Sequence, residues 1–191
     1  MAPGLLAIGA SPRAGSNSDI VLAEALKAAE AAGADCTTLF LRDYEFADCI
    51  ECNGCQKTGR CVVDDRMQEL FPLVAGAELL VIATPVFFMN IPGTFKCFID
   101  RFQCYWARRY ALKLPPPEPR KKGVLFCTGG MDRPQQLDLI RPSIKAWFHV
   151  INAKYIDGAF FGPVDEKGAI HTHPDHLARV RELTAALFRQ S

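Results

Sequence analysis

The chain has 191 residues, and its 22 Lys and Arg residues against 21 Asp and Glu residues give a formal net charge of +1. Apolar residues make up 49% of the chain and charged residues 23%, which is typical of a globular protein. At about 100–200 residues per domain, this length predicts a single domain over residues 1–191. The near-neutral charge excludes the basic surface of a nucleic-acid-binding protein and the polybasic patch of a protein that binds membrane surfaces.

The sequence also argues against a membrane or secreted protein. No apolar run reaches about 18–20 residues, the length that a membrane-spanning helix needs. The apolar segment 3–10 has no basic residues before it, which a secretory signal would have. We therefore expect a cytoplasmic protein, in which clustered cysteines indicate metal or redox chemistry rather than disulfides.

The hydrophobic pattern alternates between buried strands and amphipathic helices. It predicts strands at residues 5–10, 36–41, 78–83, 124–127 and 154–161. Apolar stripes at helical spacing follow each strand, starting near residues 18, 65, 94, 137 and 177. Strict alternation of strand and helix predicts a parallel sheet with right-handed crossovers, hence a doubly wound α/β domain.

Polar and special residues mark the expected helix ends. Ser18-Asp19 and Asp65 are expected to cap the helices that follow them, and Gly33 to end the first helix. Pro142 predicts a kink or a late start in the helix near residue 137.

The loop after the first strand, residues 9–18, carries three hydroxyls, one amide and one Arg immediately before a helix. It matches neither a Walker A loop nor a dinucleotide fingerprint. Its hydrogen-bond donors, the helix dipole and one counter-charge suit a terminal phosphate monoester. The alternative is a polar turn that only caps a helix.

The loop after the third strand, residues 83–94, is unusually apolar for the ligand-binding edge of a sheet. Such a surface is costly unless a flat apolar group covers it. An isoalloxazine ring, with apolar faces and polar edges, fits this description.

Three segments together resemble the NADPH-dependent FMN reductase branch of the flavodoxin-like proteins. They are Gly9–Arg13 with Ser16–Ser18, then Thr84–Asn90, and then Phe98–Arg101. The resemblance covers most of the chain in the same order. It implies a flavodoxin-like fold, a five-stranded parallel sheet of order 2-1-3-4-5 with helices on both faces, and FMN between strands one and three.

The resemblance also implies which residues hold FMN. In the first loop the phosphate is expected to bind Ser11, Arg13, Ser16, Asn17 and Ser18. Along the isoalloxazine we expect Pro85, Val86, Phe87, Phe88 and Asn90, and in the loop after the fourth strand Thr128, Gly129 and Gly130. Met89 departs from the family pattern, which has a glycine at this position, and is expected to alter access to the flavin.

Four of the eight cysteines, Cys49, Cys52, Cys55 and Cys61, fall within thirteen residues, in an insertion at about residues 48–64. Four thiolates at this spacing can surround one tetrahedral metal or one cubane cluster. Three cysteines at two-residue intervals are characteristic of 4Fe–4S loops, whereas structural zinc more often uses two separated pairs. Free or disulfide-forming thiols and bound zinc stay open as alternatives.

The cysteine spacing resembles the compact motif of the iron–sulfur flavoproteins, which belong to the same flavodoxin-like group. That resemblance implies an FMN-dependent oxidoreductase that passes electrons between FMN and a 4Fe–4S cluster. It further implies a ferredoxin-like or nicotinamide electron donor, a small-molecule acceptor such as oxygen or peroxide, and a homodimer or homotetramer. The cofactors are expected to carry the chemistry, so no catalytic side chain is assigned.

Two alternatives to this function remain. One is an NAD(P)H-dependent FMN or quinone reductase without a cluster, in which NAD(P)H is the co-substrate. The other is a zinc- or thiol-based redox sensor on a flavodoxin scaffold, which would bind no flavin.

Two further segments have no assigned role. Residues 103–121 contain an aromatic and Arg-rich stretch that fits a lid over the flavin, a subunit contact or an amphipathic helix extension equally well. The histidines at 171, 173 and 176 are expected to form a polar loop before the last helix rather than a metal site.

Overall fold

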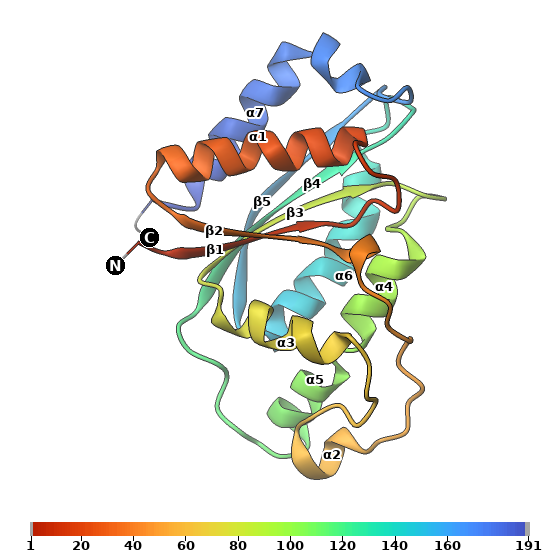
Figure 1. The fold of residues 1–191 in the computed structure, drawn as a ribbon, viewed down its shortest axis with the longest axis vertical. Coiled ribbons are helices and arrows are strands. Elements are labelled where there is room, and N and C mark those ends of the chain that lie inside the picture. Colours follow the sequence, from red (N-terminus) through yellow and green to blue (C-terminus); the bar gives the residue numbers. More distant parts are fainter. Residues whose placement is uncertain (1, 190–191) are drawn as a thin grey trace.

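The computed structural model describes residues 2–189. Its centre is a five-stranded parallel sheet of order β2-β1-β3-β4-β5 (Figure 1). The strands are β1 (Gly4–Gly9), β2 (Asp35–Phe40), β3 (Leu79–Pro85), β4 (Lys121–Thr128) and β5 (Ala153–Phe161). The predicted flavodoxin-like sheet and strand order are therefore confirmed.

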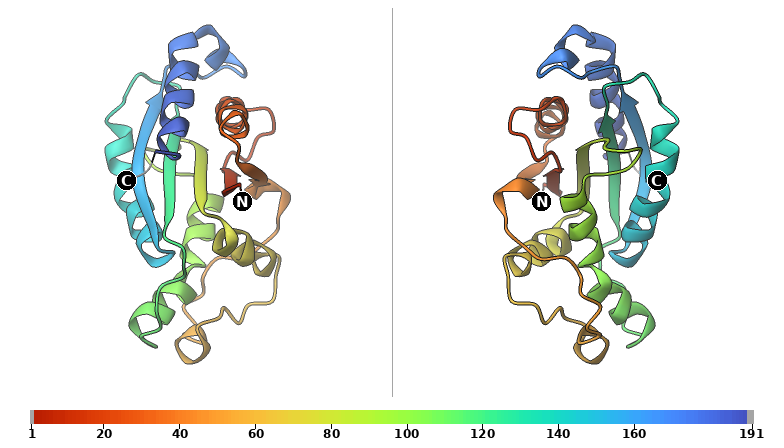
Figure 2. Two further views of the ribbon diagram at one scale, coloured as in Figure 1. Left: turned by 90° about the vertical axis from the view of Figure 1, so that its left-hand side faces the viewer. Right: turned by 90° about the vertical axis from the view of Figure 1, so that its right-hand side faces the viewer.

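Helices cover both faces of the sheet (Figure 2). α1 (Asn17–Ala31) and α7 (Pro174–Ala186) pack on one face, and α3 (Met67–Gly76), α4 (Gly93–Asp100) and α6 (Gln136–Val150) on the other. Two shorter helices, α2 (Cys55–Thr58) and α5 (Gln103–Tyr110), lie at the end of the molecule away from α7. Single 3-10 turns occur at Leu41–Asp43 and Ala169–Thr172.

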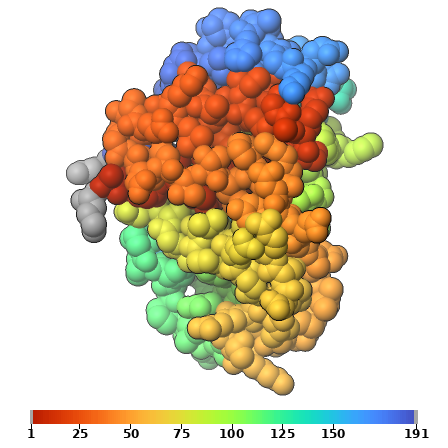
Figure 3. All heavy atoms as spheres, in the orientation of Figure 1, coloured from red at the N-terminus to blue at the C-terminus, as the bar shows by residue number. Residues whose placement is uncertain are grey.

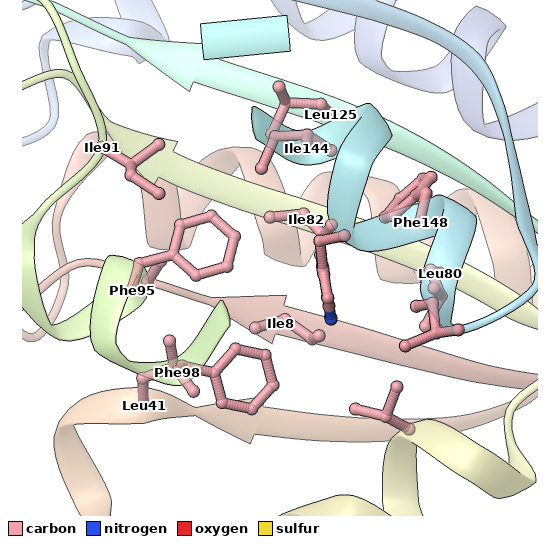
Figure 4. Packing of buried hydrophobic residues seen from close by; sticks show 14 of the residues in the cluster. Ile8, Leu41, Leu80, Ile82, Ile91, Phe95, Phe98, Leu125, Ile144 and Phe148 are labelled. Atoms are coloured by element: carbon pink, nitrogen blue, oxygen red, sulfur yellow. The ribbon is translucent and has the colours of Figure 1, made fainter. Parts of the chain in front are cut away.

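The central strands β1, β3 and β4 are largely apolar because each buries both of its faces, whereas the edge strand β2 exposes Asp35, Thr37 and Thr38. In β1, Leu6 and Ile8 point toward α3, α4 and α6, whereas Leu5 and Ala7 point toward α1 and α7. Figure 4 shows the first of these two cores, where Phe95 and Phe98 of α4 meet strand side chains such as Ile82. The resulting two-sided core fixes the carboxyl edge of the sheet, where the loops of interest emerge.

The predicted cap of the first helix and the predicted late start of the helix that contains Pro142 are wrong, whereas a kink at Pro142 stays a prediction. The first helix is capped by Ser16, whose side chain accepts a hydrogen bond from the Asp19 amide, and not by Ser18-Asp19. α6 begins at Gln136 and includes Pro142, so the proline does not delay the helix. Burial of Ile140, Ile144 and other apolar residues of α6 offsets the hydrogen bond that the proline ring cannot donate.

Within residues 2–189, no helix is both long enough and apolar enough to span a lipid bilayer.

Candidate functional site

The first loop and the start of α1 form one wall of a cavity of about 280 Å³ at the carboxyl edge of the sheet. The ends of β3 and β4 form the opposite wall. Most of the predicted FMN-binding residues line this cavity, together with Pro12, Val164 and Asp165: they are Ser11, Arg13, Ser16, Asn17, Ser18, Pro85, Val86, Phe87, Thr128, Gly129 and Gly130. Because the first backbone N–H groups of a helix lack intrahelical partners, the start of α1 can bind an anion here.

Two side chains of this cavity are already engaged within the protein. The Asn17 amide donates to the carbonyl oxygens of Val164 and Glu166, both at 2.9 Å, and accepts from the Ile170 amide at 3.2 Å. Ser18 Oγ lies 2.7 Å from Thr128 Oγ1, and both hydroxyls are buried. Asn17 therefore ties the first loop to residues 164–170, and its side chain is not oriented as a free phosphate ligand.

Two basic residues near the first loop were missed by sequence reasoning. Arg42 donates to the Ser11 carbonyl at 3.3 Å and pairs with Asp19 at 3.1 Å, while Asp19 also accepts from the Gly15 amide at 2.8 Å. The ammonium end of Lys167 lies directly over Gly15, since a Cβ at Gly15 would lie 2.9 Å from Nζ. Neither residue belongs to the loop itself, so no local motif could have indicated them.

The third-strand loop ends in a tight two-residue turn. Phe87 and Asn90 exchange backbone hydrogen bonds of 2.8 and 2.9 Å, and the residues between them, Phe88 and Met89, both have positive φ. This is the pattern of a type I′ turn, which normally uses Gly or Asn. The turn projects from the surface in yellow-green at the right of Figures 1 and 3, and the Phe88 side chain is fully exposed.

A second cavity, of about 500 Å³, lies beside this turn. It shares Val86, Phe87, Gly129 and Gly130 with the first cavity, so the two are continuous along the sheet edge. The remaining lining residues are Phe88, Met89, Met131, Arg133 and Gln136. The first, hydroxyl-rich cavity thus adjoins a second cavity that is larger and more apolar.

The predicted residue Asn90 lies outside both cavities. Its side-chain oxygen accepts from the Ile91 amide at 2.8 Å and so shapes the turn. Gln136, which was not predicted, does line the second cavity. It is buried, and its amide nitrogen lies 3.1 Å from the Met89 sulfur.

Backbone hydrogen bonds hold the cavity loops in place. The Val86 amide donates to Thr128 at 2.9 Å, and the Gly129 amide donates to Phe161 at 3.0 Å. Gly129 also accommodates a close neighbour, because a Cβ there would lie 2.8 Å from the Phe160 ring. The glycines after β4 are therefore required by packing as well as suited to a ligand.

The four clustered cysteines line one separate cavity of about 440 Å³ between the cysteine segment, residues 48–64, and α5. Cys104 of α5 lines the same cavity. Within the described residues 2–189, all eight cysteines are free, and no group of three or more Cys, His, Asp or Glu is arranged to hold a metal ion. The four thiols of the cysteine segment therefore line one cavity, but they are not arranged around a single metal-ion position.

Burial and neighbouring cysteines disfavour the thiolate forms of Cys55 and Cys104. Burial, followed by the neighbouring cysteines, raises the pKa of the Cys55 thiol. Burial together with Cys61 and Cys55 raises the pKa of Cys104 to about 12. A cation or a metal centre next to Cys55 would favour its thiolate form.

A buried ion pair closes the base of the cysteine segment. Arg101, at the end of α4, is 1% exposed and donates to both carboxylate oxygens of Asp65, at 2.6 and 3.1 Å. Burial alone would raise the pKa of Asp65, but its bonds from Arg101 and from the amides of Ala47 and Met67 lower it overall. Asp65 thus helps to cap α3, as predicted, and also anchors Arg101.

The cysteine cavity and the two cavities at the carboxyl edge of the sheet have no lining residue in common. Figure 2 places α2 and α5 at one end of the molecule and α7 at the other. Residues 103–110 form α5, which lines the cysteine cavity rather than covering the carboxyl edge of the sheet of the same chain. α5 begins three residues after α4 ends, so residues 103–110 form the helix extension that was one of the interpretations of this segment.

The family model for "NADPH-dependent FMN reductase" matches residues 3–158. The chain belongs to the NADPH-dependent FMN reductase family. It is thus an FMN-dependent oxidoreductase, and the fold and flavin-loop resemblance noted in the sequence agrees with this membership.

Individual relatives agree with the family. An "Iron-sulfur flavoprotein" of Methanosarcina thermophila is 30% identical over 158 residues, which are 82% of this chain and 79% of that protein. Among solved structures, an "NAD(P)H:quinone oxidoreductase from Methanothermobacter marburgensis" aligns with a TM-score of 0.76 at 16% identity, covering 100% of this chain and 98% of the other. An FMN-dependent NADH-azoreductase from Bacillus anthracis in complex with FMN has a TM-score of 0.71 at 16% identity, covering 98% and 100%. At these identities the structural likenesses establish the fold alone.

Proposed function

We propose that FMN binds along the carboxyl edge of the sheet, with its phosphate at the first loop and its isoalloxazine beside the 86–90 turn. The continuity of the two cavities supports this orientation, because their polar and apolar ends match the two ends of FMN. The start of α1, Ser11, Ser16 and Arg13 provide donors and charge for the phosphate. Lys167 adds a second cation at the same end.

The apolar end has the features that a flavin ring requires. Val86, Phe87 and Met89 offer apolar surface to the ring, and Gly129 lines the same cavity without a side chain. Gln136 brings a buried amide that can bond to polar ring atoms in place of the Met89 sulfur. FMN when bound supplies one- or two-electron chemistry, and these side chains position it and limit solvent access.

We further propose that Cys49, Cys52, Cys55 and Cys61 hold a 4Fe–4S cluster. The donor set fits such a group: four thiols surround one cavity, and the adjacent Arg101 presents a buried Nε–H that has no partner. An unpartnered buried donor is costly, and an anionic sulfur centre would satisfy it. The name of the Methanosarcina relative supports the same assignment.

This arrangement favours assembly from more than one chain. The cysteine cavity and the flavin edge share no lining residue, so a second copy of the chain that placed its cysteine segment next to this FMN would shorten the path of the electrons. We therefore propose a homodimer or homotetramer that takes electrons from a ferredoxin-like or nicotinamide donor and reduces a small-molecule acceptor.

Metal and flavin analysis of anaerobically purified protein tests this function. We expect one FMN, about four irons and about four acid-labile sulfides per chain, and a broad absorbance near about 400 nm that dithionite bleaches. Cys52→Ala should lose the iron and keep FMN, whereas the matched control Cys97→Ala, outside the cavity, should keep both. Stoichiometric zinc, or FMN without iron in the wild type, would contradict the cluster.

A second candidate function is an NAD(P)H-dependent FMN or quinone reductase without a cluster. The match to the "NADPH-dependent FMN reductase" family model and the likeness to an "NAD(P)H:quinone oxidoreductase" support it. It predicts FMN without iron, together with quinone reduction by NAD(P)H that survives Cys52→Ala.

A further inference from the structure

Arg101 holds both ends of the segment that carries the four cysteines. Its Nη1 donates to the carbonyl of Ala47 at 2.9 Å, just before Cys49. Its Nη2 approaches the carbonyl of Val63 at 3.4 Å, just after Cys61. One guanidinium therefore joins the two points where the segment leaves and rejoins the domain.

Asp65 adds further hydrogen bonds at the same place. We call the set formed by Arg101, Asp65 and the backbone of Ala47 and Val63 the clasp. The same carboxylate that pairs with Arg101 accepts the Ala47 amide at 2.9 Å and the Met67 amide at 3.0 Å. The two charged side chains and the Ala47 peptide thus form a closed set of hydrogen bonds at the base of the segment. The neighbouring acid in sequence, Asp100, has no part in it and pairs with Lys96 on the surface.

The clasp leaves one donor unused. Arg101 Nε is buried and has no hydrogen-bond partner, although the side chain lines the cysteine cavity. A purely structural ion pair would gain nothing from an unsatisfied buried N–H, which costs about 1–3 kcal/mol. Arg101 therefore places both an unpaired N–H donor and a buried positive charge in the wall of the cysteine cavity.

We propose that Arg101 is the positioning residue and the local counter-charge of the cysteine site, fixing the segment through its Nη atoms and stabilising a bound anionic group through Nε and its charge. The counter-charge role rests on the proposed cluster, whereas the clasp does not. A positive charge beside a redox centre favours the reduced state, which carries one more negative charge. Asp65 opposes this effect, so the two residues should act on the centre with opposite signs.

The reduction potential of the cluster tests the counter-charge. Relative to wild type, Arg101→Met should lower the equilibrium constant for one-electron reduction at least tenfold, which is about 59 mV. Asp65→Asn should raise it, and Arg101→Lys, which keeps the charge, should stay within a few-fold. Arg60→Gln, which removes an exposed cation of the same segment, is the control and should leave the potential unchanged. Shifts of the same sign in Arg101→Met and Asp65→Asn would overturn the counter-charge role.

Hydrogen exchange in the metal-free protein tests the clasp. Arg101→Met and Arg101→Lys should both speed exchange of the amides in residues 48–64 at least tenfold, because lysine cannot span two carbonyls and a carboxylate. Arg60→Gln should exchange like wild type, and unchanged exchange in both Arg101 variants would overturn the clasp. If the wild type proves to bind no iron, the proposed cluster and the counter-charge fall together, and the exchange result alone decides the clasp.

Discussion

His173 and His176 form a stacked pair at the start of α7, with ring centroids 4.7 Å apart and planes inclined by 13°. His176 also lies against the Phe161 ring, and its buried Nδ1 has no hydrogen-bond partner. Burial, reinforced by the neighbouring His173, lowers the pKa of His176 below its ordinary 6.5. The folded protein therefore favours the neutral ring, as expected for a structural histidine rather than a charged binding group.

This lowered pKa predicts a pH-dependent stability. The contribution of His176 is fully present above pH 6.5 and is lost as the pH falls from 6.5 through its lowered native pKa, because the unfolded chain binds the proton more tightly. The expected loss in free energy of unfolding is small, because the partly exposed ring is screened by solvent. Urea unfolding between pH 8 and 5 should show a smaller decline in His176→Gln than in wild type. The exposed His171→Gln is the control, and equal declines in all three proteins would contradict the shift.

At the residue scale, the sequence indicates that the first-loop residues lie together at one cavity, but it does not specify the hydrogen-bond partners that each side chain has within the protein. Ser16, Asn17 and Ser18 were all assigned to phosphate, but Ser16 caps α1, Asn17 bonds to residues 164–170, and Ser18 contacts Thr128. These partners lie up to 153 positions away in sequence, and no local pattern specifies them. Lys167 was missed for the same reason.

At the scale of single elements, the 86–90 turn is the most strained part of the candidate site. Two successive bulky residues adopt positive φ there, which costs about 1–2 kcal/mol for each non-glycine residue. Met89 receives some compensation through its contact with Gln136, whereas the fully exposed Phe88 receives little. Such strain at a cavity edge suggests a turn shaped for binding rather than for stability.

Met89→Gly is expected to stabilise the protein by about 1 kcal/mol, because glycine adopts positive φ without steric cost. Thermal or urea unfolding measures the change. Val86→Gly, at a neighbouring position outside the positive-φ pair, should instead destabilise. Destabilisation of similar size in both variants would show that the Met89 side chain contributes more through packing than its conformation costs.

The elements themselves could largely be predicted from the sequence, since continuous apolar runs mark β1, β3 and β4 and helical stripes mark α1 and α3. The geometry of the cysteine segment could not be predicted. It has little regular structure, and its placement depends on Arg101, which lies 40 positions beyond Cys61 and whose sequence neighbours gave no sign of the pairing with Asp65.

At the scale of the whole molecule, the two candidate sites lie apart, one at the carboxyl edge of the sheet and one between the cysteine segment and α5. The crossover from β1 to α1 and the turn after β3 meet at the carboxyl edge because β1 and β3 are adjacent in the sheet although β2 lies between them in sequence. The cysteine segment lies at the end of the molecule next to α5, beyond α3 and away from this edge (Figure 1). The proposed electron transfer between two copies of the chain rests on this separation.

The central claim is that the first loop and the 86–90 turn bind opposite ends of one FMN molecule. Titration of flavin-free protein with FMN and with riboflavin, followed by the quenching of flavin fluorescence, tests it most directly. We expect FMN to bind with a Kd of micromolar or below and riboflavin about 100-fold more weakly, a difference of about 2.7 kcal/mol from the charge-assisted phosphate contacts. Equal affinity for the two flavins, or no binding of FMN, would contradict the account.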